Sequence, residues 1–131
     1  MIYKSYIVEQ DVNTVKENLG LFYGENLGLK NDFKKKIIIA NNKCQILRFS
    51  NEEILKNKNN ILKEISNISL FGNKKIIFID QANEKILELI EEIQENINED
   101  RIFLFADALE KRSKLRSYFE KTKNCASIPC Y

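Results

Sequence analysis

Short apolar runs alternate with longer amphipathic stretches along most of the 131 residues. Continuous apolar runs are typical of strands that are covered on both faces, and helices with one apolar stripe connect such strands in parallel sheets. The pattern therefore predicts an α/β fold of three layers, with a mostly parallel sheet flanked by helices. The predicted strands are residues 19–23, 44–49, 75–80, 101–106 and 126–128.

The segments between the predicted strands carry helical stripes and helix start signals. Ser50 and Glu53 have the spacing of a capping box ahead of the second helix. Asp107 with Glu110 is a candidate cap for the last helix. The apolar stripes are Leu29, Phe33, Ile37 and Ala40, then Ile54, Ile61, Leu62 and Ile65, then Ile86, Ile90, Ile93 and Ile97, and finally Leu115, Tyr118 and Phe119.

The two ends of the chain follow the pattern less clearly. Residues 2–8 fit an additional strand ahead of a short helix at residues 12–17. At the other end we expect Pro129 to break the last strand, and no covering helix follows it. We therefore expect residues 1–131 to be a single domain, the amino-terminal one of a longer protein.

Composition restricts the chemistry that the chain can perform. Histidine is absent, which removes the commonest general base and the commonest zinc ligand. Cys44, Cys125 and Cys130 have no CxxC spacing, so we expect no disulfide and no metal site. No apolar run approaches the roughly 18 residues that cross a bilayer, and the amino terminus lacks the layout of a signal peptide. We expect a cytoplasmic protein without a cofactor and without membrane contact.

The segment after the first predicted strand resembles part of a phosphate-binding loop, GxxxxGK[ST]. Gly24 and Lys30 have the required separation. However, Leu29 replaces the second glycine, and Asn31 replaces the hydroxyl that would bind magnesium. We therefore expect a degenerate nucleotide site that does not bind nucleotide, with a divergent P-loop nucleotide-binding or hydrolysing domain as the alternative.

Asp80 closes the third predicted strand, where a P-loop enzyme has its magnesium-holding acid. Gln81 follows it, in place of the second carboxylate that would activate water. A cap for the next helix is the commoner role of such an aspartate. Asp80 also stands where a response-regulator receiver has its phosphoacceptor, but Ala106 and Pro129 replace the hydroxyl and the lysine which that chemistry requires.

Two basic segments interrupt a chain whose net charge is only +2. Residues 34–36 are three consecutive lysines on a predicted helix, a pattern typical of a solvated face. The denser segment contains Lys111, Arg112, Lys114 and Arg116, which are candidate contacts for DNA phosphates or for another subunit. Without aromatic residues for base stacking, we expect any DNA binding to be weak.

The stretch Ser69, Leu70, Phe71 and Gly72 places a large apolar pair at a helix–strand junction, where an α/β domain usually has a polar turn. Leu70 and Phe71 either pack into the core or protrude as an anchor for a partner. The residues alone favour the core. They leave the exposed anchor open as the alternative.

Three motifs, taken in order, resemble the delta subunit of bacterial DNA polymerase III. They are residues 22–29 (FYGENLGL), residues 69–72 (SLFG), and residues 111–121 (KRSKLRSYFEK). The resemblance covers essentially the whole chain and corresponds to the amino-terminal domain of that subunit.

The resemblance implies an AAA+-like domain that has lost its nucleotide site, without intrinsic enzymatic activity. Delta subunits belong to the clamp loader and bind the ring-shaped sliding clamp, the beta subunit, so that one of its interfaces opens during DNA replication. Their hydrophobic pair lies on an exposed element, and Ser69, Leu70, Phe71 and Gly72 occupy that place here. The other clamp-loader subunits would be bound through domains outside this sequence.

Overall fold

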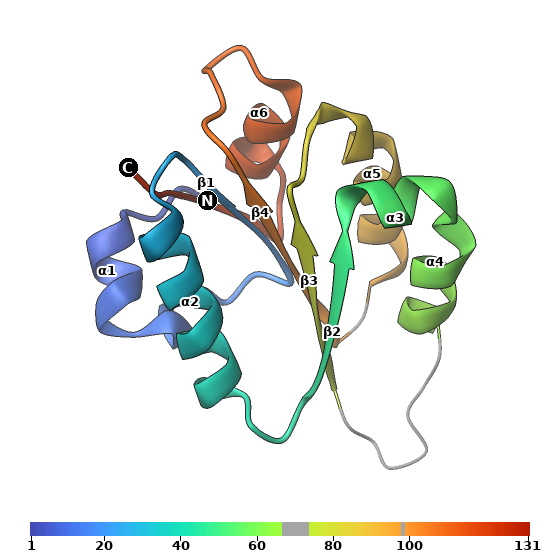
Figure 1. Cartoon of the computed structure of the whole chain (residues 1–131), viewed down its shortest axis with the longest axis horizontal. Helices are drawn as coiled ribbons and strands as arrows, with labels where there is room; N and C mark the ends of the chain where they lie inside the picture. Colours follow the sequence, from blue (N-terminus) through green and yellow to red (C-terminus); the bar gives the residue numbers. More distant parts are fainter. Residues whose placement is uncertain (67–73, 98) are drawn as a thin grey trace.

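The computed structural model describes residues 1–66, 74–97 and 99–131, and contains a five-stranded parallel sheet between two layers of helices (Figure 1). The strand order is β2-β3-β4-β1-β5. The predicted α/β class and parallel sheet are therefore confirmed. The strands are β1 (Leu19–Tyr23), β2 (Gln45–Ser50), β3 (Lys75–Asp80), β4 (Arg101–Ala106) and β5 (Cys125–Pro129).

The helices divide between the two faces of the sheet. The connection from β1 to β2 runs in one direction along the strand order, and the connections from β2 to β3, from β3 to β4 and from β4 to β5 run in the other, so their helices cover opposite faces. The first two, α1 and α2, cover one face, and α3 to α6 cover the other (Figure 1). This division gives two buried apolar clusters with the sheet between them. The helices are α1 (Ser5–Gln10), α2 (Leu27–Ala40), α3 (Asn51–Lys56), α4 (Lys58–Ser66), α5 (Leu87–Asn96) and α6 (Lys114–Lys121), with short 3₁₀ turns at Val12–Thr14 and Glu84–Ile86.

The strand β1 lies between β4 and β5 and is buried along its whole length. Because successive side chains of a strand point to opposite faces, Leu21 and Tyr23 enter the cluster under α3 to α6, while Phe22 enters the cluster under α2. There the Phe22 ring stacks on Phe105 at 5.1 Å and lies 5.0 Å from the ring of Phe33. This strand thus joins both halves of the core.

The start of the last helix differs from the prediction. The helix α6 begins at Lys114, and its cap is Ser113, whose hydroxyl accepts a hydrogen bond from the amide of Arg116. The predicted cap from Asp107 and Glu110 was wrong, because residues 107–113 form a loop that leads from β4 to the helix. Ser113 accepts the hydrogen bond from the amide three residues later, as the predicted Asp107 cap would have done, but the helix starts six residues further along the chain.

The capping box of Ser50 and Glu53 is confirmed, but the helix that it starts is short. At Asn57 the backbone leaves the helical conformation, and α4 begins as a separate helix one residue later. The stripe that predicted one helix is therefore shared by two. Ile54 lies in α3, and Ile61 and Ile65 lie in α4, all in the same core cluster.

The ends of the chain lie side by side at the edge of the sheet (Figure 1). Ile2 forms an isolated bridge with Ser127, and the helix α1 follows, so the strand expected at residues 2–8 is reduced to a single pair. The strand β5 includes Pro129, which we expected to break it. A proline is tolerated there because β5 is an edge strand of the sheet.

We predict that Phe33→Ala lowers the free energy of unfolding by about 3 to 5 kcal/mol, because Phe33 is 0% exposed in the cluster under α2. Urea denaturation measures the change. Ile39→Ala in the same helix is the matched control, since Ile39 is 75% exposed, and it should change stability by less than about 0.5 kcal/mol. Equal effects of both substitutions would contradict the arrangement of this helix.

Candidate functional site

The connections of the sheet reverse direction at β1. The strand β1 leads into α2 on one face, whereas its neighbour β4 leads into α6 on the other. In open α/β sheets, ligands bind in the crevice between the carboxyl ends of two such strands. The order also differs from the 2-1-3-4-5 order of receiver domains, which excludes the phosphoacceptor interpretation of Asp80.

The loop after β1 is folded against the ends of the neighbouring strands. The amide of Gly24 donates to the carbonyl oxygens of Ala106 and Asp107, at 3.3 and 3.2 Å. The amide of Asn26 donates to the carbonyl oxygen of Cys130 at 3.1 Å. A phosphate-binding loop keeps such amides available for its ligand. In this chain the amides of Gly24 and Asn26 are hydrogen-bonded to carbonyl oxygens of the protein's own backbone.

Lys30 is 5% exposed and lies across the crevice between β1 and β4. Its Nζ donates to the carbonyl oxygen of Ala106, the last residue of β4, at 3.0 Å. The carboxylate of Asp107 is 3.6 Å away but fully exposed, so this ion pair is weak. The lysine that would reach a phosphate in a P-loop therefore binds the end of a strand.

Asp80 does not meet Lys30 directly but pairs with Lys34, one helical turn further along α2. The Lys34 ammonium also lies 4.6 Å from the centre of the Phe105 ring. The sequence interpretation assigned Lys34 to a solvated run of lysines and missed this role. The separation of four residues from Lys30 was the available signal, because it places both lysines on one side of the helix.

The crevice continues into a hollow of 400 Å³ at the carboxyl edge of the sheet. The predicted residues Lys30 and Asp80 both line it, and Gly24 lies in the loop beside them. Its other lining residues are Leu27, Asn31, Lys34, Gln81, Phe105, Ala106 and Asp107.

Burial keeps two side chains at this edge neutral. The thiol of Cys130 is fully buried, and burial raises its pKa to about 12. Burial also raises the pKa of Tyr23 above its usual range, with a smaller contribution from its hydrogen bond to Tyr131. Neither group can act as a nucleophile or base near neutral pH.

Arg116, one of the candidate DNA contacts, is engaged inside the domain. Its side chain is 14% exposed, and its Nη1 donates to the carbonyl oxygen of Leu109 at 2.9 Å. The guanidinium lies 4.9 Å from the centre of the Tyr23 ring and 3.5 Å from the carboxylate of Glu120. Arg116 therefore fixes the loop before α6 against β1.

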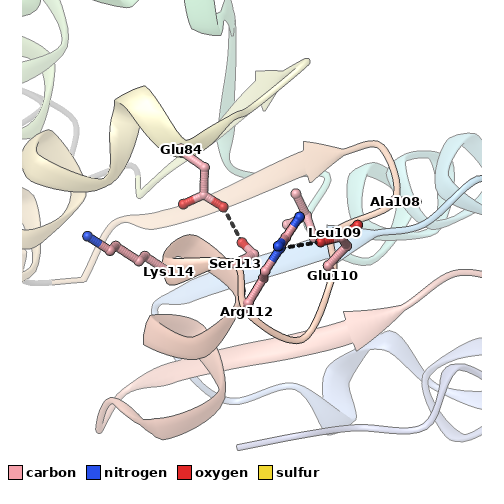
Figure 2. Close-up of a pocket in the computed structure, with 7 residues that line it drawn as sticks. All are labelled: Glu84, Ala108, Leu109, Glu110, Arg112, Ser113 and Lys114. Carbon is pink, nitrogen blue, oxygen red and sulfur yellow. Dashed lines mark hydrogen bonds and ion pairs between the residues drawn. The ribbon is translucent and has the colours of Figure 1, made fainter.

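Arg112 and Lys114 of the basic segment line a second hollow, of 430 Å³, at the start of α6 (Figure 2). Glu84 accepts hydrogen bonds from the Ser113 hydroxyl and from the amide of Leu115, at 2.9 Å for the latter. Arg112 turns back to Glu110, whereas Lys114 extends away from it (Figure 2). Lys111 is exposed as well.

The predicted clamp-binding residues Ser69, Leu70, Phe71 and Gly72 lie outside the described residues. The structure gives their flanks, which are α4 before them and β3 after them. In the described part of the chain, no group of three or more His, Cys, Asp or Glu side chains has the arrangement of a metal site. The same residues contain no helix long and apolar enough to span a membrane.

The fold and this edge of the sheet define a class of protein: a parallel α/β domain that has, at the reversal of strand order, a buried lysine and a loop bonded to the protein's own backbone. The family model described as DNA polymerase III, delta subunit, matches residues 21–129, and the chain belongs to this family. No curated protein matches the chain. The family places the chain among the clamp-loader subunits of the DNA polymerase III complex, which associate with the sliding clamp in DNA replication.

We predict that Gly24→Ala destabilises the domain by about 2 kcal/mol or more, as measured by urea denaturation. Gly24 has φ +136°, and a Cβ there would lie 1.9 Å from the carbonyl oxygen of Cys130. Gly28→Ala is the control, because its Cβ would make only an ordinary contact at 3.6 Å, inside α2. It should leave stability unchanged or raise it by up to about 1 kcal/mol. If Gly24→Ala left the free energy of unfolding unchanged, the loop would not pack against the Cys130 carbonyl as described.

Proposed function

We propose that this chain is a non-catalytic domain of a clamp-loader delta subunit, which binds the sliding clamp through an exposed Leu-Phe element and helps to open the ring. The observation that carries the proposal is the position of Ser69, Leu70, Phe71 and Gly72. They lie inside the region matched by the family model, between α4 and β3. An apolar pair at this junction has the chemistry of an interface anchor.

The binding free energy of the Leu70 and Phe71 anchor can be estimated from the apolar surface that it would bury. Burial of Leu70 and Phe71 in an apolar pocket of the clamp would contribute roughly 1.5 to 3 kcal/mol for each side chain. The cost of ordering the element reduces this amount. Gly72 permits a sharp turn of the backbone directly after the anchor, and Ser69 can hydrogen-bond the turn before it.

Ring opening requires that the domain bind the opened clamp more tightly than the closed clamp. Such a difference in affinity shifts the equilibrium of the ring without any chemical step in this domain. The closed crevice supports this mechanism, since the Gly24 amide and the Lys30 ammonium are already bonded within the protein. We therefore interpret the domain as AAA+-like with a degenerate nucleotide site.

Replacement of both anchor residues tests the proposal. We expect Leu70→Ala with Phe71→Ala to weaken binding to the cognate clamp by about 100-fold or more, measured by calorimetry. The matched control is Leu27→Ala with Ile39→Ala, which removes two other apolar side chains that are 66% and 75% exposed. The control should bind like the unaltered chain. Clamp binding that survives loss of the anchor would refute the proposal, provided that thermal unfolding shows both variants folded.

The competing function is nucleotide binding at Lys30 and Asp80. We expect titration with magnesium ATP to give no binding in the micromolar range, because Lys30 and Asp80 are both already paired within the protein. A saturable signal that Lys30→Met removes would favour the nucleotide-binding function instead.

A further inference from the structure

A hollow of 510 Å³ lies at the amino edge of the sheet, opposite the closed crevice. Asn18 directly precedes β1, Lys74 directly precedes β3, and Arg101 is the first residue of β4. The walls are therefore attached to the ends of three central strands. The lining residues are Asn13, Val15, Lys16, Asn18, Lys74, Glu99 and Arg101.

Arg101 is held in a fixed orientation at this hollow. Its Nη2 donates to the carbonyl oxygens of Val15 and Glu17, at 2.7 and 3.1 Å, and its Nε donates to Glu17 at 3.3 Å. The guanidinium also lies 4.8 Å from the centre of the Phe103 ring. Its Nη1 makes no hydrogen bond to the residues that the structure describes. A guanidinium fixed in this way loses little entropy when it binds an anion.

The charge of the lining favours an anionic ligand. Three cations, Lys16, Lys74 and Arg101, face one carboxylate, that of Glu99. Two other acids, Glu17 and Asp100, lie next to lining residues along the chain but do not line the hollow, and both accept hydrogen bonds within the domain. Glu17 accepts the Tyr3 hydroxyl at 2.7 Å, and Asp100 accepts the amide of Lys75 at 3.1 Å. Both lysines of the lining are exposed, so a partner can reach them.

The hollow adjoins the proposed anchor along the chain. Only one residue separates Lys74 from Gly72. Leu70 is four residues from Lys74, and four residues of fully extended chain span at most about 14 Å, so a clamp that holds Leu70 and Phe71 must come near Lys74. Interfaces of this kind surround an apolar anchor with a polar rim that sets the association rate and the partner.

We propose that the hollow between Lys16, Lys74 and Arg101 receives a carboxylate side chain of the sliding clamp, beside the Leu70 and Phe71 anchor. This inference rests on the proposed function. We favour a protein carboxylate over a DNA phosphate because Lys74 is close to the apolar anchor along the chain, whereas the denser basic segment lies at the start of α6. The carboxylate would steer the clamp onto the anchor and fix its orientation.

Charge reversal tests this site. We expect Lys16→Glu with Lys74→Glu, in the full chain, to lower affinity for the cognate clamp by about tenfold at about 50 mM salt, mainly through slower association. The effect should shrink at about 500 mM salt, because exposed charges are then screened. The matched control is Lys35→Glu with Lys85→Glu, which makes the same change of net charge at exposed positions elsewhere. It should change the affinity by less than about twofold.

The outcomes separate this inference from the function on which it rests. If the unaltered chain binds the clamp and loss of the anchor abolishes binding, but both charge-reversal variants bind equally well, the carboxylate site is refuted and the anchor stands. If Lys16→Glu with Lys74→Glu weakens binding of a DNA duplex and not of the clamp, the ligand is a phosphate and the inference is wrong. If the unaltered chain does not bind the clamp, the proposed function itself fails.

Discussion

The hydrogen bond between the Lys30 ammonium and the Ala106 carbonyl oxygen joins α2 to the end of β4 at the carboxyl edge of the sheet. A buried ammonium costs several kcal/mol unless polar groups surround it, so Lys30 must keep a partner. Its partner is the end of β4, directly across the crevice in which α/β domains bind ligands. A ligand at that place would have to compete with a contact that supports α2 and the sheet together.

Closure of the crevice extends beyond one lysine. Gly24 has a conformation that admits no side chain, because the carbonyl of Cys130 occupies the space. The loop after β1 is thereby bonded to Cys130, the residue that follows β5. Arg116 in turn holds the loop after β4 against β1 through its contact with the Tyr23 ring. The loops at the carboxyl edge of the sheet are therefore held to the strands by contacts within the protein.

Sequence patterns predicted the strands of this fold well, because a parallel sheet buries both faces and leaves continuous apolar runs such as residues 75–80 and 101–106. Helix boundaries were less predictable. The apolar stripe continues across the break at Asn57, so periodicity alone could not reveal two helices. Asp107 and Ser113 are both residue types that cap helices, and the true start is distinguished by contacts of the folded chain, namely the bond from the Arg116 amide to the Ser113 hydroxyl and the contacts of Glu84 with Ser113 and Leu115.

The candidate site was predictable only in part, for a physical reason. The absence of a second glycine at Leu29 and of a hydroxyl at Asn31 is visible in the sequence, but the partners of the Gly24 amide and the Lys30 ammonium are backbone carbonyls of distant residues. Any residue can supply a carbonyl, so no sequence pattern marks it. The same holds for Arg101, whose orientation depends on the carbonyls of Val15 and Glu17. Local sequence chemistry can therefore indicate which motif residues are present or missing, whereas the backbone groups that bind or orient a side chain become apparent only from the fold.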